Sequence, residues 1–430
     1  MNQSAASIQN CPKSPLFWIV SAAYWTLAVI TLLNLNLVGR MGFGVERAFS
    51  PLILACCLIL ILIGALSVPW LRALGVPGFC FIAALTSYLA IGSLVGFATE
   101  LDSHPDKEFW YFLSSYAKTV VVVVAAAFGS CIVLRGLGAE RLLGLVLLLM
   151  ILNCLLILVS PFPLKHDNRL SGTIGNSNYA GLYGCLTVAL TLSFIWSNPL
   201  QKLARWGFPL CTLAAIGTFS RTAMLILFLL FLRFLTGGAR MWKPMIKWLL
   251  LASIAVLVGG AIVGEISAIL DDDQRRRLKT LAVLGQEGLH DSSFNQRFLL
   301  MNLALDEVSQ SPIVGSGLGN LHRLDNAPLN KLGLPLGAHN QYLVIIGEGG
   351  VVPLVFLMVF LAFLLLPTWK MTSVADSAVA AWTLVLALFF LTTHTILLQR
   401  FSNFLIGLSC ALLALGTERN RGSVSLSQSK

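Results

Sequence analysis

The sequence predicts an all-α polytopic membrane protein, with about twelve transmembrane helices and one large polar loop. The 430 residues are 57% hydrophobic and only 11% charged, which is far from the composition of a soluble domain. Apolar stretches of about twenty residues recur along the chain, and each is long enough to cross a bilayer as a helix. Backbone groups in lipid must be hydrogen-bonded within their own segment, so we expect these stretches to be helices.

The expected elements follow in chain order, interrupted by the polar segment 265–340. Met1–Pro15 runs into the first helix without a convincing cleavage site, which indicates an uncleaved signal-anchor. We expect the first nine helices in 1–264, a loop over 265–340, and the last three helices with a tail in 341–430. The expected helices are 17–36, 50–68, 78–98, 111–134, 142–161, 178–196, 206–220, 221–236, 248–264, 341–366, 378–398 and 401–417.

Lysine and arginine predict the orientation of these helices. With the N-terminus in the cytoplasm, fourteen of the 29 basic residues lie on cytoplasmic loops and tails and eight on short outer segments. The others lie in 265–340, which is too long for the rule to count. Both termini are therefore expected in the cytoplasm and 265–340 outside. The formal charge of +10 mostly reflects this topology, so we do not expect nucleic-acid binding.

Cysteines and acidic residues predict no metal site. Eight of the nine cysteines fall within expected helices, and no pair has the spacing of metal ligands. The acidic run Asp271–Asp273 would point its carboxylates in different directions on a helix, and Arg275–Arg277 follow it. We therefore expect neither a metal nor another cofactor.

Polar segments on the outer side contain two ordered features. The segment 162–177 is rich in Gly, Ser and Asn, which predicts a turn with Asn176 or Ser177 as the N-cap of the next helix. Within the long loop, a helix is expected from Ser293 to Ser311. Its apolar face would consist of Phe294, Phe298, Met301, Leu305 and Val308. The glycines of 315–320 follow no strand and precede no P-loop lysine, so they do not indicate nucleotide binding.

Two arginines are candidates for binding phosphate. Arg221 opens an apolar helix on the outer side, and Arg297 lies on the amphipathic helix of the loop. Each has a plain structural alternative, because Arg221 would also anchor a helix end and Arg297 would also suit a solvated helix face. The planar guanidinium fork donates two hydrogen bonds to phosphate and stays charged. Two such groups at one cavity would bind a diphosphate.

His339 is the more specific candidate. It lies where the tenth expected helix begins, and ionisable groups near membrane depth are candidates for function. The positive end of the helix should disfavour the imidazolium form, which leaves a neutral ring that can accept a proton. The alternative is a histidine that caps the helix or hydrogen-bonds to a carbonyl.

The residues around these candidates resemble a known family. Thr218–Leu230, Asn295–Asn320 and above all Gly337–Pro353 are similar to the O-antigen ligase and polymerase superfamily of bacterial inner membranes. The family pattern is His, then Asn, Ser or Gln, nine residues, Gly, two residues, and Gly, Thr or Tyr. His339-Asn340 and Gly350 match this pattern, whereas Pro353 departs from it, at a position expected inside a helix. The turn ending at Asn178 and the pair Ser220-Arg221 also resemble family segments.

The resemblance implies a GT-C-like fold and a metal-independent, inverting glycosyltransferase at the periplasmic side of the bacterial inner membrane. Its donor would be an undecaprenyl-diphosphate-linked glycan, and its acceptor the lipid A-core oligosaccharide. Arg221 and Arg297 would bind the donor diphosphate, and His339 would activate the acceptor hydroxyl. Asn340 and Asn178 complete the substrate-binding residues that we predict.

Three alternatives remain at this point. An O-antigen or exopolysaccharide polymerase would pass the glycan to another lipid-linked repeat, and a protein O-oligosaccharyltransferase would pass it to protein. A polytopic lipid or glycan transporter would share the helices. It is disfavoured because the two halves lack corresponding Gly/Pro-broken helices. We favour the ligase because the single long loop, the spacing of Arg297 to His339 and the chain length fit it.

Overall fold

The computed structural model describes residues 14–35, 46–99, 107–159, 170–194, 200–236, 292–321, 337–368, 373–393 and 395–427. Within these ranges the elements are α-helices and short 3₁₀ turns, with no strand among them, so the predicted all-α class is confirmed. Six helices of the described part are long and apolar enough to cross a membrane. The number of about twelve stays a prediction, and the expected helix 248–264 lies outside the described residues.

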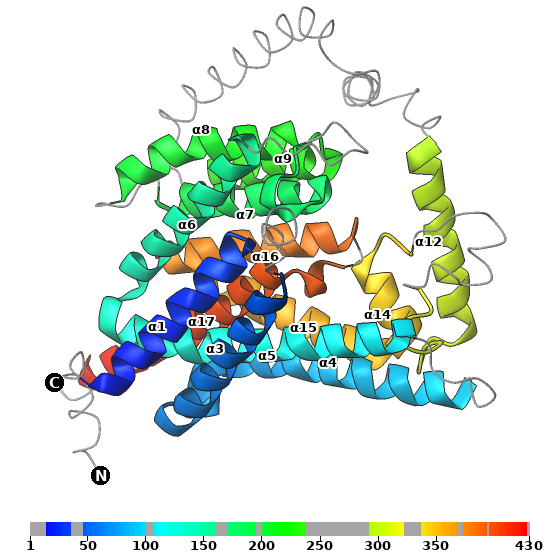
Figure 1. The fold of residues 1–430 in the computed structure, drawn as a ribbon, viewed down its shortest axis with the longest axis horizontal. Helices are drawn as coiled ribbons and strands as arrows, with labels where there is room; N and C mark the ends of the chain where they lie inside the picture. Colours follow the sequence, from blue (N-terminus) through cyan, green and yellow to red (C-terminus); the bar gives the residue numbers. More distant parts are fainter. Residues whose placement is uncertain are drawn as a thin grey trace, which may run out of the picture. The chain divides into compact units, whose positions relative to one another are not determined.

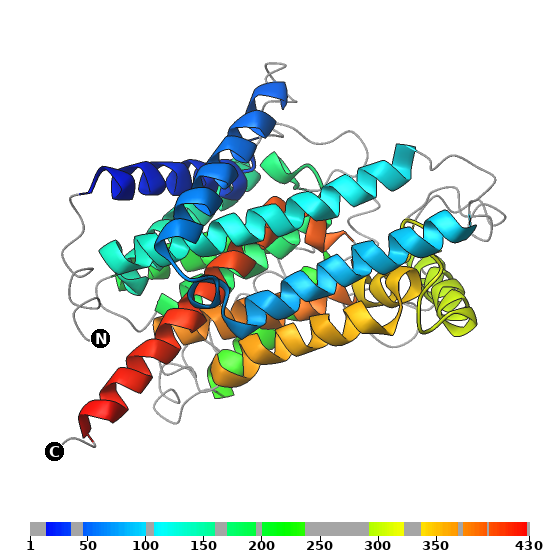
Figure 2. The same cartoon turned by 90° about the horizontal axis from the view of Figure 1, so that it is seen from below.

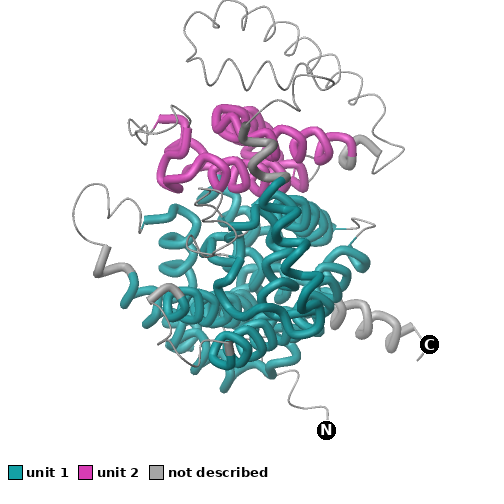
Figure 3. The backbone as a smooth tube through the Cα atoms, turned by 90° about the vertical axis from the view of Figure 1, so that its right-hand side faces the viewer, with its two compact units in different colours: residues 1–150, 296–430 teal, residues 151–295 magenta. Residues whose placement is uncertain are grey.

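The chain forms two compact units, which Figure 3 colours separately. Unit 1 consists of residues 1–150 and 296–430, and unit 2 consists of residues 151–295. Unit 1 therefore combines helices from both ends of the chain. The sequence predicted a different division, into membrane helices before 264, a polar loop over 265–340 and membrane helices after 340. That division concerns position in the membrane, and it stays a prediction.

Unit 1 is a bundle of long helices. α5 packs against α3 and α17, and α4 packs against α15 and α5, so that α4, α5 and α15 run side by side (Figures 1 and 2). A Cβ on Gly407 of α17 would lie 2.4 Å from the carbonyl oxygen of Val123, so glycine permits the close approach to α5. The main helices are α1 (Pro15–Leu32), α3 (Glu46–Ser67), α4 (Trp70–Thr99), α5 (Lys107–Leu137), α15 (Val351–Thr368), α16 (Val374–Phe390) and α17 (Arg400–Ser427). Shorter or shared elements are α14 (Gln341–Gly349), η4 (Ile396–Leu398), α12 (Ser292–Gln310) and the first part of α6 (Ala139–Val159).

Two expected helices of unit 1 are interrupted. The expected helix 341–366 divides into α14 and α15 at Gly350, whose φ of 80° is open to glycine but strained for other residues. Pro353 consequently lies in the first turn of α15, where a missing N–H costs nothing, and not in a helix interior as expected. The expected helix 378–398 ends at Phe390, and the residues before α17 form the 3₁₀ turn η4.

Unit 2 is arranged around α7 (Ser177–Phe194), which packs against α8 (Gln201–Gly217) and α9 (Arg221–Thr236). Every residue of α7 from Ala180 to Phe194 is buried. A Cβ on Gly184 would lie 2.7 Å from that of Ala215, so glycine again sets the distance between helices. The 3₁₀ turn η1 (Gly172–Ile174) and the second part of α6 complete this unit, and Thr173 donates a hydrogen bond to Asn153 between them.

Candidate functional site

His339 occupies a tight turn immediately before α14. The N–H of Asn340 donates to the carbonyl of Ala338 at 2.7 Å, which closes a three-residue turn centred on His339. Asn340 then caps the helix, because its Oδ1 accepts from the N–H groups of Tyr342 at 2.9 Å and Leu343 at 3.2 Å. The histidine is half-buried, with its backbone fixed by the turn on one side and by the cap on the other. Capping is thus performed by Asn340, which answers one of the two structural alternatives for His339.

Apolar side chains pack against the turn that contains His339. Ala338 is buried in a cluster with Ala304 of α12, Leu321 and Val344 of α14. The backbone joins the same cluster, because the N–H of Ala338 donates to the carbonyl of Leu321 at 3.1 Å. On another side, the hydroxyl of Tyr342 donates to the carbonyl of Ala387 in α16 at 3.0 Å. The position of the histidine's segment is therefore fixed by α12, by α16 and by the backbone of Leu321.

Buried polar groups lie along the inner face of α14. Gln341 is fully buried, and its Nε2 donates to the hydroxyl of Tyr116 in α5 at 3.3 Å. Glu348 is also fully buried, and its carboxylate accepts from the Tyr88 hydroxyl in α4 and from the N–H of Leu321 at 2.8 Å. Glu348 is not among the site residues predicted from the sequence. The available signal was that it is the one carboxylate within the twelve expected helices.

The glycine-rich segment 315–320 joins α14 to α4. Ser316 N–H donates to the Gly347 carbonyl at 2.7 Å, and Gly317 N–H donates to the Glu348 carbonyl at 3.2 Å. Leu318 N–H donates to the carbonyl of Gly92 in α4 at 2.8 Å. The first two bonds satisfy carbonyls in the last turn of α14, and the third attaches the segment to α4. The segment therefore links α14, the helix that follows His339, to α4 through backbone hydrogen bonds.

Arg297 lies in the first part of α12, and its side chain is outside what the structure describes. The predicted helix is confirmed, but its expected apolar face is wrong in part. Leu300 and Ala304 are buried, whereas Leu305 is 45% exposed. The buried face of α12 is the one that carries Ala304, which packs in the same cluster as Ala338. The spacing of large apolar residues along the sequence does not predict this face.

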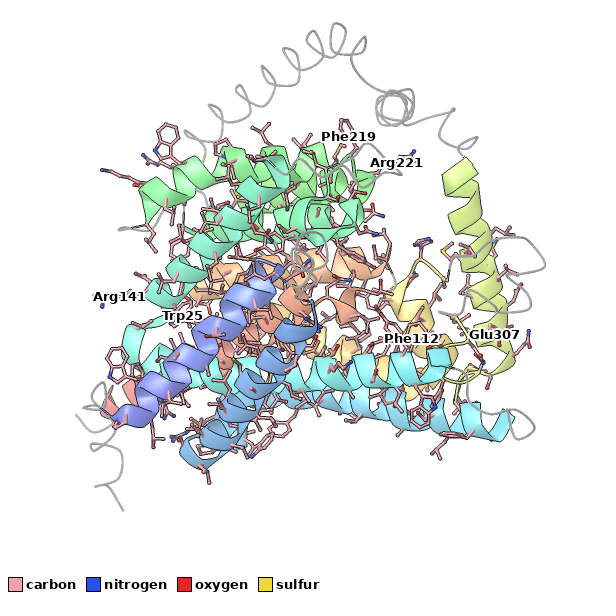
Figure 4. The ribbon with its side chains drawn as sticks, viewed as in Figure 1. Trp25, Phe112, Arg141, Phe219, Arg221 and Glu307 are labelled. Atoms are coloured by element: carbon pink, nitrogen blue, oxygen red, sulfur yellow. The ribbon has the colours of Figure 1, made fainter. Side chains whose placement is uncertain are left out.

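Arg221 is the first residue of α9 in unit 2 and is half-buried (Figure 4). The turn before it is constrained: Phe219 has a φ of 48°, an uncommon value for a side-chain-bearing residue. Ser220 caps α9, because its Oγ accepts from the N–H of Ala223 at 3.4 Å. The local fold thus places the arginine at a defined helix end.

Asn178 lies at the beginning of α7 in the same unit. The expected cap is confirmed, because the Oδ1 of Asn176 accepts from the N–H of Asn178 at 2.9 Å. A Cβ on Gly181, one turn further along α7, would lie 3.1 Å from the Cβ of Ser220. Asn178 and Arg221 are therefore brought to the same end of unit 2, while the segments carrying Arg297, His339 and Asn340 belong to unit 1.

The described residues contain no group of three or more His, Cys, Asp or Glu side chains that could hold a metal. Asp271–Asp273 lie outside them. The eight cysteines within the described ranges are free.

Together, the span-length apolar helices and the capped histidine turn define an all-helical membrane protein with a polar site at a helix start. Residues 206–358 match a family model described as O-antigen ligase. This match confirms the resemblance to the O-antigen ligase superfamily and supports, in general terms, a function of the ligase or polymerase type. Arg221, Arg297, His339 and Asn340 lie inside the matched region, and Asn178 lies outside it. Comparison with curated proteins gave no match.

Proposed function

We propose that this protein is an inner-membrane glycosyltransferase of the O-antigen ligase type. It moves a glycan from undecaprenyl diphosphate to the lipid A-core oligosaccharide on the periplasmic side. The observation that carries the proposal is the position of His339, in a hydrogen-bonded turn closed by Asn340 at the start of α14, within the region that matches the family.

His339 acts as the general base. It directly precedes α14, and a neutral imidazole at this place can accept a proton. A sugar hydroxyl of the acceptor gives its proton to the imidazole as its oxygen attacks the anomeric carbon of the donor. The new glycosidic bond forms as the bond to the diphosphate oxygen breaks, and attack from the opposite face inverts the anomeric configuration.

Arg221 and Arg297 stabilise the leaving diphosphate. Negative charge grows on its oxygen as the glycosyl bond breaks, and guanidinium groups fixed in position lower the energy of that charge. Asn178, at the end of unit 2 that also carries Arg221, adds an amide that suits hydrogen bonds to phosphate or sugar. Asn340 contributes by fixing the turn that carries His339. The mechanism requires no metal, because the arginines supply the positive charge.

The direct cellular test is a gel of surface lipopolysaccharide from a strain in which the gene is deleted. We expect loss of the O-antigen bands, accumulation of lipid-linked polymer, and restoration by the wild-type chain. Arrest at core plus one repeat would instead assign the polymerase reaction. An unaltered lipopolysaccharide profile would contradict both and would favour transfer to protein, or transport.

A further inference from the structure

Glu348 is a buried carboxylate that the proposed mechanism does not use. We propose that it is a positioning residue, which fixes the peptide of Leu321 and, through it, the turn that carries His339. The inference rests on the proposed function, because it assigns a purpose to Glu348 only if His339 acts in transfer.

The connection runs through one residue of the backbone. Leu321 donates its N–H to Glu348 Oε1 at 2.8 Å and accepts from the N–H of Ala338 at 3.1 Å. Ala338 is the residue before His339, and its carbonyl closes the turn around the histidine. Leu321 and Ala338 also flank residues 322–336, so their bond joins the two ends of that segment. Glu348 thus fixes the peptide of Leu321, to which Ala338 and the turn around His339 are bonded.

The other oxygen of Glu348 is held by tyrosines. Tyr88 in α4 donates to Oε2, and its ring packs edge-on against Tyr116 in α5, with centroids 5.0 Å apart. Tyr116 in turn accepts from Gln341, the first residue of α14. Both ends of α14 are therefore tied through tyrosines to the long helices of unit 1. These two attachments oppose rotation of α14, so the backbone of His339 keeps its place relative to α4 and α5.

A carboxyl group suits this place because it has two oxygen atoms that accept hydrogen bonds. Leu321 donates to one oxygen of Glu348 and Tyr88 of α4 donates to the other. A buried polar group is costly unless it has such partners. An apolar side chain of the same size would fill the space but would leave the N–H of Leu321 without its acceptor. The expected consequence is a shifted turn, and displacement of a catalytic group by about 1 Å can lower a rate about 100-fold.

The test compares kcat, KM and donor binding for the purified full-length chain. An undecaprenyl-diphosphate-linked O-antigen glycan is the donor, lipid A-core the acceptor, and undecaprenyl diphosphate the binding probe. Glu348→Leu should lower kcat about 10- to 100-fold and leave the binding of undecaprenyl diphosphate nearly unchanged. Glu348→Gln, which keeps a carbonyl oxygen for Leu321, should retain most of the turnover. Tyr24→Phe, the loss of a buried hydroxyl elsewhere in unit 1, is the matched control and should resemble wild type.

The decisive comparison repeats Glu348→Leu in a His339→Gln background. If Glu348 acts through His339, the second substitution should add little, because the group that it positions is already gone. Equal losses in both backgrounds, or a wild-type kcat in Glu348→Leu, would overturn the proposal. If Glu348→Leu does not accumulate, Tyr88→Phe replaces it, with an expected loss of about 3- to 10-fold in wild type only. Normal turnover by His339→Gln alone would instead refute the proposed function and remove the basis of this inference.

Discussion

At the scale of single residues, neighbours of His339 perform the structural roles at the site. Asn340 caps α14 with its side chain, which leaves the adjacent histidine free of that task. Ala338 and Leu321 hold the turn through their backbones. The backbone of His339 is therefore fixed by its neighbours in the chain and in space, which places the residue for use as a general base.

The arginines give the prediction that belongs to this scale. Arg221→Lys and Arg297→Lys should each lower transfer at least about 10-fold, because lysine keeps the charge but loses the planar fork that binds two phosphate oxygens. Transfer is measured as lipopolysaccharide glycan per unit of protein in the membrane. Arg141→Lys, at an exposed position of α6, is the control and should behave as wild type. Wild-type transfer by both lysine variants at normal abundance would refute the diphosphate role.

The residues that can be predicted from the sequence make contacts with near neighbours in the chain. Those that cannot be predicted make contacts with distant segments. His339, Asn340 and the cap at Asn176 follow from local patterns, because a cap and its helix are neighbours in the chain. Glu348 acts through the backbone of Leu321, 27 positions away, and through a tyrosine of α4. No local pattern encodes such a bond. The functional roles assigned to all five residues stay predictions: His339, Asn340, Arg221, Arg297 and Asn178.

At the scale of elements, the break at Gly350 determines the site. The apolar run 341–366 has the length of one membrane helix, so hydropathy predicts a single element. The chain instead turns at Gly350 because the carbonyl of Ile313 lies close to it, and Val351 donates its N–H to that carbonyl at 3.3 Å. The short α14 can then take its own direction, set by α4 and the glycine segment 315–320. Hydropathy predicts the length of an apolar stretch. It does not predict that the backbone of Ile313 packs against Gly350.

Substitution at this break should be poorly tolerated. In Gly350→Ala the new Cβ would lie 1.9 Å from the carbonyl oxygen of Ile313, at a φ of 80° that alanine disfavours. We expect a destabilisation of at least about 1 kcal/mol, because both the backbone conformation and the contact must change. Thermal unfolding in detergent and transfer activity measure the effect. Gly416→Ala, where nothing lies within 4 Å of the new Cβ, is the control. Equal melting temperatures for the two variants would contradict the assigned role of Gly350.

At the scale of the whole molecule, composition predicts the class and packing determines the units. An all-helical membrane protein follows from the apolar content, and six span-length helices agree with it. The pairing of α5 with α17 joins segments from opposite ends of the chain. Apolar helices in lipid have no sequence signal for their partners beyond small residues such as Gly407, so hydropathy alone does not predict this pairing.

The central claim is that His339 is the base of a metal-independent glycan transfer. Its most direct test uses the purified full-length chain with lipid-linked donor and lipid A-core acceptor, in the presence of EDTA. The wild-type protein should be active. His339→Gln, which can still form a hydrogen bond but cannot act as a base at neutral pH, should be slower by a factor of about 10²–10⁴. Binding of undecaprenyl diphosphate should be unchanged in that variant, because the arginines are assigned to the diphosphate. Near-normal turnover by the folded glutamine variant, or loss of wild-type activity with EDTA, would contradict the account.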